Sequence, residues 1–199
     1  MSGFIDKAEL YRLVDERRAA LSIRGPADPY QLAERLGIAV SCYAFESRRL
    51  SGFLMRGERH SEIVLNAAGG PESRRFTVAH ELIHYLLHSG GQFLCENTGV
   101  SQGAVGALEW QANQGAAELL MPYRVFLPFV KNIRSILLSD ERRAFRLIAK
   151  EFSVGPSTAR LRLRDLAPEF EQYCSGVPLE ELQIVAASKA KTASRSIDV

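Results

Sequence analysis

Hydrophobic residues recur along the chain at two spacings, one typical of strands and one typical of helices. The first part of the chain predicts a helix over residues 3–21 and a second helix that Asp28 caps, Pro29 starts and Leu36-Gly37 ends. Three short stretches with strand-like content come next, at 38–45, 51–56 and 61–66. Polar or glycine-containing turns separate these stretches, so we expect a small antiparallel meander.

Helical spacing dominates the rest of the chain. From Pro71 to His88, apolar side chains surround most of the expected helix, which predicts that this helix is buried. After a loop over 92–105, the pattern predicts further helices at about 106–120, 140–152 and 156–165. Strands followed mainly by helices are the order of an α+β domain.

Composition and spacing divide the chain into three parts. We expect one domain over 1–130, a helical C-terminal subdomain over 131–185, and a flexible tail over 186–199 that is rich in serine, alanine and lysine. Within the subdomain, two of the expected helices flank a tight turn at 153–155, which resembles a helix-turn-helix hairpin.

The composition is that of a globular protein. Of the 199 residues, 46% are hydrophobic and 24% are charged, which excludes a disordered chain. No apolar run approaches the roughly 20 residues that cross a bilayer, and the first residues lack a signal-peptide pattern. Three widely separated cysteines suit free thiols in a reducing compartment. We therefore expect a cytoplasmic protein that does not bind a membrane.

His80, Glu81 and His84 form the pattern HExxH within the expected buried helix. Residues four apart share a helix face, so both imidazoles can reach one metal ion at about 2.0–2.1 Å. Glu81 is rotated by about 100° and can act as a general base on a water molecule. The alternative, two core histidines bonded to backbone carbonyls, must satisfy three buried polar groups within one turn. The pattern therefore predicts a metal site with Glu81 as its catalytic residue.

A catalytic zinc site needs a third protein ligand, and Glu109 is the best candidate. His88 continues the even spacing, but on a straight helix it lies about 12 Å along the axis from His80. We expect it to be a helix-end residue instead. Glu109 shares a helix face with Ala112, which permits close approach to the metal helix, and with Asn113, which can support a ligand imidazole.

Several secondary assignments stay open at this point. Glu118 lies on the opposite side of the helix that carries the third ligand, and Glu96 lies in an expected loop, so both are weaker candidates. Two histidines and one glutamate favour zinc, although manganese or iron also fits. Candidate side chains for stabilising an oxyanion are Tyr85, Tyr123 and Arg75.

The formal net charge is only +2, but basic residues are concentrated in residues 131–164. This segment has nine basic and three acidic side chains. A helix-turn-helix that contacts DNA would explain the excess. The other two explanations are a helical hairpin with solvated arginines and a docking surface for a protein substrate. The basic residues are Lys131, Arg134, Arg142, Arg143, Arg146, Lys150, Arg160, Arg162 and Arg164.

Two long blocks closely resemble the ImmA/IrrE family of metallopeptidases. The first block runs from Arg74 to His88 and the second from Glu109 to Pro122, in the order found in the family. Weaker similarity extends the resemblance to about residues 25–167.

This resemblance implies a zincin-like fold in which His80, His84 and Glu109 bind zinc and Glu81 is the catalytic carboxylate. It also implies a substrate, because such enzymes cleave helix-turn-helix repressors of mobile elements, phages or stress genes. Cleavage of the repressor switches transcription on. The oligomeric state does not follow from the resemblance.

The chain departs from the family pattern at three places. Ile83 stands where the family usually has glycine, Gly115 stands where it usually has phenylalanine, and Gly155-Pro156 alters a turn. None of these changes removes a ligand. The length suits the shorter ImmA-like branch. The alternative function is a DNA-binding or repressor-binding module, of the toxin–antitoxin type, whose metal site does not cleave. The presence of Glu81 argues against it.

Overall fold

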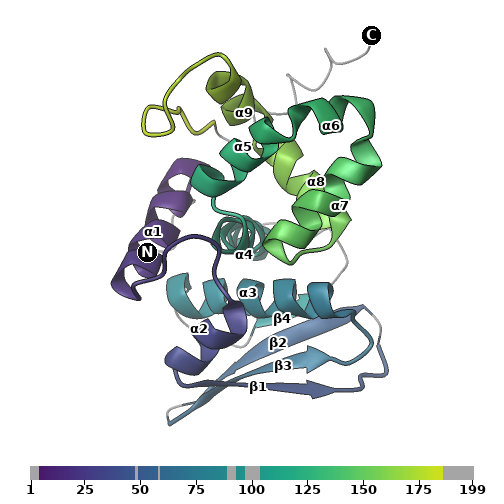
Figure 1. Ribbon diagram of the computed structural model, residues 1–199. Helices are drawn as coiled ribbons and strands as arrows, with labels where there is room; N and C mark the ends of the chain where they lie inside the picture. The colour runs from purple at the N-terminus through teal and green to yellow at the C-terminus, as the bar shows by residue number, and fades with distance from the viewer. Residues whose placement is uncertain (1–4, 48, 58, 89–92, 97–103, 186–199) are drawn as a thin grey trace.

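The computed structural model describes most of the chain: residues 5–47, 49–57, 59–88, 93–96 and 104–185. A four-stranded sheet forms one layer, and the helix α3 (Pro71–Leu87) lies across it (Figure 1). The helix α4 (Ala104–Leu120) packs on α3, and the later helices lie beyond α4. The protein is therefore a mixed α+β structure in which α3 is enclosed between the sheet and other helices.

The sheet is mixed, with the strand order β1-β3-β2-β4. Its strands are β1 (Ile38–Tyr43), β2 (Leu50–Arg56), β3 (Ser61–Asn66) and β4 (Phe93–Glu96). Strand β2 is antiparallel to β3 and β4, but β1 runs parallel to β3.

The expected antiparallel meander is therefore wrong for β1. Strand β3 is the most deeply buried of the first three strands, with Ile63 to Asn66 all buried, whereas only Ile38 is buried in β1. A strand buried in this way takes the position between two neighbours, and the mostly exposed β1 takes an edge. The strand β4 lies within the segment that was expected to be a loop.

The helix α3 has a sharp start and a sharp end. Gly70 is its N-cap in extended conformation, and Pro71 suits the first turn because proline has no N–H to leave unpaired. His88 ends the helix with φ −112° and ψ 121°. The stretch from Thr77 to His84 is buried throughout, which confirms the expected buried helix.

Ile83 on α3 and Gly115 on α4, two of the departures from the family pattern, lie against each other. A Cβ atom on Gly115 would lie 2.9 Å from Cγ2 of Ile83, closer than real side chains approach. Ala112 and Ala116, on the same helix as Gly115, are fully buried. The isoleucine thus fills the space that a side chain at position 115 would need. The two departures therefore compensate each other in packing.

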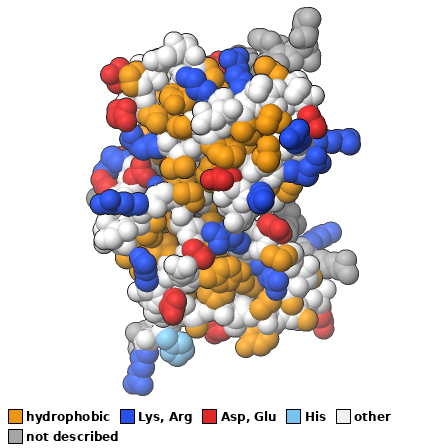
Figure 2. All heavy atoms as spheres, in the orientation of Figure 1, with side chains coloured by type: hydrophobic (Ala, Val, Ile, Leu, Met, Phe, Trp, Pro, Cys, Tyr) orange, Lys and Arg blue, Asp and Glu red, His pale blue; other side chains and the backbone are white. Residues whose placement is uncertain are grey.

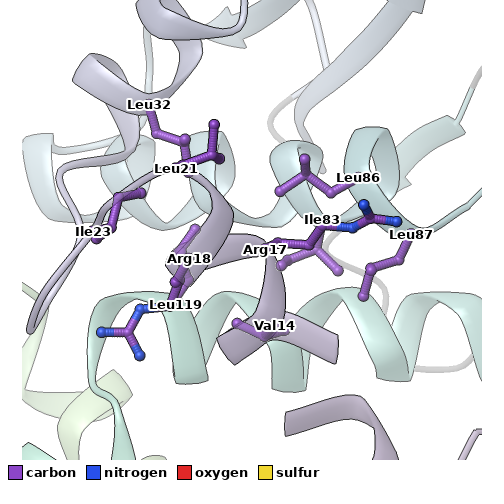
Figure 3. Close-up of a pocket in the computed structure, with 10 residues that line it drawn as sticks. All are labelled: Val14, Arg17, Arg18, Leu21, Ile23, Leu32, Ile83, Leu86, Leu87 and Leu119. Carbon is purple, nitrogen blue, oxygen red and sulfur yellow. The ribbon is translucent and has the colours of Figure 1, made fainter. Parts of the chain in front are cut away.

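A small apolar cavity lies beside this contact, between α1 (Lys7–Ala20), α3 and α4 (Figure 3). Its volume is about 10 Å³, at the lower limit for a single water molecule. It is a packing void rather than a ligand site. Its lining residues are Val14, Arg17, Arg18, Leu21, Ile23, Leu32, Ile83, Leu86, Leu87 and Leu119.

Both N-terminal helices have a side-chain cap, of which that of Asp28 was predicted and that of Asp6 was not. The side chain of Asp6 accepts a hydrogen bond at the start of α1, and that of Asp28 does so at the start of α2 (Pro29–Arg35). The helix α1 packs against α4, and α2 packs against α3 and β1.

The C-terminal part is helical, as predicted. Asp140 caps α7 (Glu141–Phe152), and Ser153 ends it in left-handed conformation with φ 52° before α8 (Pro156–Asp165) begins. Three helices here were not predicted: α5 (Tyr123–Asn132), α6 (Arg134–Ser139) and α9 (Ala167–Cys174).

The proposed division of the chain after residue 130 stays a prediction, and α5 continues across that position. The predicted tail, 186–199, lies outside the described residues. Within the described part of the chain, no helix has the length and apolarity needed to span a membrane.

Candidate metal centre

His80, His84 and Glu109 meet where α3 packs against α4. The Nε2 atoms of the two histidines are 3.1 Å apart. Oε2 of Glu109 lies 3.2 Å from Nε2 of His80, and Oε1 lies 3.3 Å from Nε2 of His84. The helix spacing brings the imidazoles together, and the close α3–α4 contact brings the carboxylate to them.

These distances suit one metal ion. Four ligands at about 2.0–2.1 Å in a tetrahedron lie about 3.3 Å from one another. The three ligand atoms are all within 4.8 Å of one another, and their types are those that zinc binds. The side chain of Glu109 is 19% exposed and that of His84 is 0% exposed, so solvent reaches the group from the glutamate side.

The charge states also suit metal binding. Burial lowers the pKa of His84 to about 4, although Glu109 acts in the opposite direction. Burial acts to raise the pKa of Glu109, but the adjacent imidazoles of His80 and His84 outweigh it and lower that pKa to about 2. At neutral pH, His84 is therefore neutral and Glu109 is ionised, which are the forms that bind metals.

A second layer of side chains supports the histidines. Nδ1 of His80 lies 3.0 Å from Oδ1 of Asn113, in the arrangement expected from the helix face. His88, expected only as a helix-end residue, is buried and folds back so that its Nδ1 lies 3.0 Å from Nδ1 of His84. Its Nε2 lies 3.0 Å from Oε1 of Gln111. Sequence reasoning missed Gln111, although it lies two residues from the third ligand.

Arg56 fixes the backbone at the end of α3. Its Nη2 donates hydrogen bonds to the carbonyl oxygens of His84 at 2.5 Å and of His88 at 2.7 Å. Its guanidinium also lies over the ring of Tyr85, 5.0 Å from the centroid. The carbonyl oxygen of His84 also accepts from the backbone N–H of His88, so the arginine from the sheet adds a second hydrogen bond there and ties the last turn of α3 to the residue that ends it.

The other candidate catalytic residues each have their own surroundings. Glu81 is fully buried, one position after the first ligand. Arg75 is bound to Asp28 and to the carbonyl oxygen of Ala27, so it holds the start of α2. The ring of Tyr123 stacks on Tyr11, and its backbone N–H donates to Glu118.

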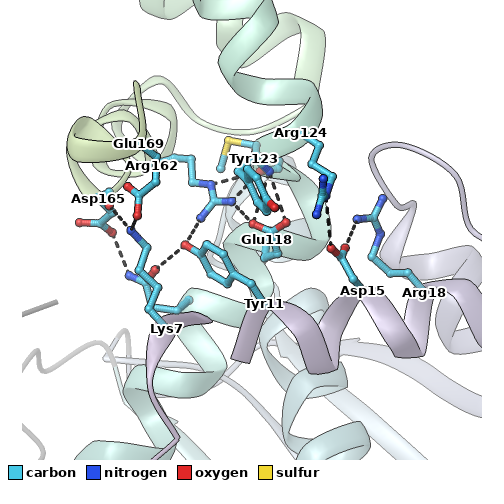
Figure 4. Close-up of polar contacts among 12 residues, drawn as sticks. Lys7, Tyr11, Asp15, Arg18, Glu118, Tyr123, Arg124, Arg162, Asp165 and Glu169 are labelled. Carbon is cyan, nitrogen blue, oxygen red and sulfur yellow. Dashed lines mark hydrogen bonds and ion pairs between the residues drawn. The ribbon is translucent and has the colours of Figure 1, made fainter. Parts of the chain in front are cut away.

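Glu118 belongs to a buried ionic network on the other side of α4 (Figure 4). Arg162 donates hydrogen bonds to its carboxylate, to the hydroxyl of Tyr11 and to the carbonyl oxygen of Met121. Both charged side chains are fully buried. Burial raises the pKa of Glu118 to about 7, although Arg162 opposes this rise. The ion pair of Glu118 with Arg162 therefore holds α8 against α4.

The basic residues of the C-terminal part do not share one role. Arg162 is buried in the network, and Arg160 pairs with Glu141 on α7. Arg146 and Lys150 line a groove of about 640 Å³ between α7 and the start of α3. Figure 2 shows lysine and arginine side chains spread over the visible face rather than gathered in one patch.

A mixed α+β fold with a His–His–Glu group between two packed helices defines the broad class, a protein able to hold a metal ion. The sequence profile of the peptidase M78 family, described as the IrrE N-terminal-like domain, matches residues 33–164. The chain belongs to this family, the ImmA/IrrE family of metallopeptidases.

The chain is also similar to one curated protein and to one solved structure. The radiation response metalloprotease IrrE of Deinococcus radiodurans is 30% identical over 111 residues, which are 55% of this chain and 32% of that protein. The match thus spans about a third of the curated relative. A solved structure titled Mycobacterium tuberculosis transcriptional regulator has a TM-score of 0.51 and 22% identity, and it covers 77% of this chain and 46% of that one. This second similarity shows the fold alone.

Proposed function

We propose that the protein is a zinc-dependent endopeptidase that cleaves a helix-turn-helix repressor at a specific site. The observation that carries the proposal is the meeting of three ligand atoms, from His80, His84 and Glu109, at 3.1–3.3 Å from one another. Membership of the family and the name of the IrrE relative support peptide hydrolysis as the reaction.

The proposed ligands for zinc are His80, His84 and Glu109, and manganese or iron is the alternative. Bound zinc would supply Lewis acidity, lowering the pKa of a water molecule and polarising the scissile carbonyl. In a group with one carboxylate and two neutral imidazoles, the ligands cancel only one of the two positive charges of the ion.

Glu81 is the proposed general base and acid. It is fully buried and adjacent in sequence to His80, which places it in the turn of α3 that carries the ligands. Its carboxylate takes a proton from the attacking water and later gives a proton to the leaving amine. The water oxygen first bonds to the carbonyl carbon, and the bond between that carbon and the nitrogen breaks when the nitrogen receives the proton from Glu81.

The proposed substrate class follows from the family resemblance. A repressor of a mobile element, a phage or stress genes is an intracellular protein, so the peptidase would act in the cytoplasm. Cleavage would inactivate the repressor and derepress its genes. The groove lined by Arg146 and Lys150 is the proposed docking surface for this partner.

The test is cleavage of purified helix-turn-helix repressors encoded beside this gene, followed by gel electrophoresis and mass spectrometry. The wild-type protein loaded with zinc should give two fragments, whereas Glu81→Gln should give none and keep its zinc. The matched control is Glu171→Gln, which removes an exposed carboxylate on α9, outside the metal group and the groove, and should cleave normally. Normal cleavage by Glu81→Gln would contradict the mechanism.

The metal is tested separately, by elemental mass spectrometry of the purified protein. We expect near one zinc per chain in the wild type and a clear loss in Glu109→Ala. A wild-type protein that cannot be loaded with zinc would contradict the zinc assignment.

The second candidate is a repressor-binding or DNA-binding module with a metal site that does not cleave. It would be favoured if the zinc-loaded wild type bound a repressor without cutting it. For DNA, salt-dependent duplex binding that is lost on changing Arg160 and Arg164 to alanine would support contact. Arg162 is unsuitable for this test because it is buried.

A further inference from the structure

The groove of about 640 Å³ between α7 and the start of α3 has basic side chains from both helices. Helix α7 contributes Arg146, Ala149 and Lys150, whose spacing of three and four residues places them on one face of the helix. Helix α3 contributes Arg74 and Arg75 from its first turns. A ligand in the groove would therefore meet positive charge from two directions.

The two basic side chains of α7 are available to a ligand. Within the part of the chain that the structure describes, neither Arg146 nor Lys150 forms a hydrogen bond or an ion pair, and both are exposed. They lie four residues apart on the helix, where like charges are neighbours and repel each other. An anionic group bound between them would offset this repulsion.

The basic side chains of α3 are partly occupied. Arg75 pairs with Asp28 at 3.1 Å, and Nη1 of Arg74 lies 3.5 Å from Sγ of Cys42. Among the described residues that line the groove, Glu72 is the one acidic side chain. Four basic side chains against one acidic side chain give the lining a net positive charge, so the groove suits an anionic ligand.

Apolar surface in the groove narrows the class of anion. Tyr30 is 39% exposed, and Pro71 and Pro156 are also exposed within the lining. A peptide segment that carries both carboxylates and apolar side chains matches this mixed lining. A DNA duplex matches it less well, because a duplex is read by protein elements that enter its grooves, whereas these charges line a hollow in the protein.

We infer that this groove binds an acidic segment of the repressor, with carboxylates held by Arg146 and Lys150. The inference rests on the proposed function and names the part of the partner that docks. The DNA-reading surface of a helix-turn-helix protein is itself basic, so the groove would repel that surface. The acidic segment therefore lies elsewhere on the repressor.

The groove lies close to the metal group without belonging to it. Arg75 precedes His80 by five residues, which is about 7.5 Å along the axis of α3. A segment docked in the groove would thus bring the adjoining part of the repressor towards the ligands. Because the groove holds the partner away from the reacting atoms, it should affect KM and leave kcat unchanged.

The first test measures binding of three fluorescein-labelled probes to the full chain by fluorescence anisotropy at low salt. One probe is a short peptide in which aspartate and glutamate alternate with leucine, and the second has lysine in place of the acidic residues. The third is a DNA duplex. Mass spectrometry checks that the peptides stay intact during the measurement.

The variant reverses the charge of the α7 wall by combining Arg146→Glu with Lys150→Glu. The matched control combines Arg59→Glu with Arg134→Glu, which makes the same change in net charge at exposed residues outside the groove. Because all four side chains are exposed, we expect both proteins to fold, and thermal unfolding checks this.

We expect the wild type and the control to prefer the acidic peptide. The groove variant should bind that peptide at least about 10-fold more weakly and should prefer the lysine peptide instead. Added salt should weaken binding of the preferred peptide in each protein.

Three results would overturn the inference. The wild type may fail to bind the acidic peptide at low salt, or the groove variant and the control may bind it equally. The third is binding of the duplex in place of the acidic peptide, lost in the groove variant, which would assign the groove to DNA.

The second test uses a repressor that the wild type cleaves. The groove variant should have a KM about 10-fold higher with kcat unchanged, whereas the control should match the wild type. A loss of kcat in the groove variant would contradict a docking role. If no protein cleaves any repressor, the proposed function fails, and the peptide measurements still decide what the groove binds.

Discussion

Two glutamates on α4, one partly exposed and one fully buried, have opposite pKa shifts. Glu109 and Glu118 are nine residues apart, so they point to opposite sides of the helix. Glu109 faces two imidazoles and has a pKa lowered to about 2, whereas Glu118 faces the guanidinium of Arg162 and has a pKa raised to about 7. Glu118, which lies beside the positively charged guanidinium, thus keeps its proton to a higher pH than Glu109 does.

The depth of burial explains this difference. Burial is the largest single influence on both pKa values, but Glu118 is fully buried, whereas the side chain of Glu109 keeps 19% of its surface exposed and lies beside two imidazoles that together outweigh its burial. Removing a carboxylate from water disfavours its charge more strongly than one partner restores it. The side of α4 that carries Glu109 therefore keeps an ionised carboxylate available. The side that carries Glu118 uses its carboxylate to hold helices together.

The largest expected effect comes from breaking the buried ion pair between Arg162 and Glu118. Arg162→Met would leave Glu118 buried without its guanidinium, so we expect a loss of about 3–5 kcal/mol in the free energy of unfolding. Adding Glu118→Leu should recover much of this loss because no buried charge then remains. Urea unfolding of the metal-free proteins measures both. A single variant as stable as the wild type would contradict the structural role of the pair.

The contributions of His84 and Glu118 to stability should also respond to pH in opposite directions. His84 has an ordinary pKa of 6.5 and a folded pKa of about 4, so the unfolded chain takes up the proton first as pH falls. Its contribution to stability is therefore lost as pH falls from about 6.5 to 4, by about 3 kcal/mol. The raised pKa of Glu118 acts oppositely, because stability is then lost as pH rises from 4.5 to about 7.

Urea unfolding of metal-free wild type and His84→Leu at pH 7, 5.5 and 4 tests this difference. The variant should lack most of the acid-dependent loss that the wild type shows. Identical pH dependence in the two proteins would mean that His84 is not the acid-sensitive group.

A smaller effect is expected at the contact that brings α3 and α4 together. Gly115→Ala would place a methyl group 2.9 Å from Ile83, so we expect a loss of about 1–3 kcal/mol from overpacking. In the double variant, Ile83→Ala should relieve the clash, giving a favourable coupling in a double-mutant cycle. Gly69→Ala is the control, because its nearest neighbour would be at 3.5 Å. Simple additivity would show that the two departures from the family pattern are independent.

The smallest effect is expected at the exposed ion pair of Arg160 and Glu141. Their side chains are 51% and 55% exposed, so Arg160→Ala should cost less than about 1 kcal/mol. Thermal unfolding at low and high salt measures the change. A loss as large as that of Arg162→Met would mean that charge at the surface, rather than burial, holds α7 and α8.

The sequence was informative where the rules are local. The predicted ligands His80, His84 and Glu109 meet in the structure because residues four apart share a helix face and because alanines allow two helices to approach. The support of His80 by Asn113 follows from the same helical spacing.

Features that depend on distant parts of the chain were not predictable in this way. The parallel position of β1 depends on which strand is buried most deeply, and three adjacent strand patterns do not encode that choice. Arg162 was counted with the surface charges because its partner, Glu118, lies 44 residues earlier in the chain. His88 was set aside on the assumption of a straight helix, whereas the helix ends there.

The ionic network also sets an order of events during protein synthesis. Glu118 is synthesised 44 residues before its partner Arg162. Lys7 is synthesised 162 residues before its partner Glu169. Until those late residues emerge, neither Glu118 nor Lys7 has the buried partner that it has in the folded chain. The ion pairs that join α4 to α8 and α1 to α9 therefore form only when nearly the whole described chain has been translated.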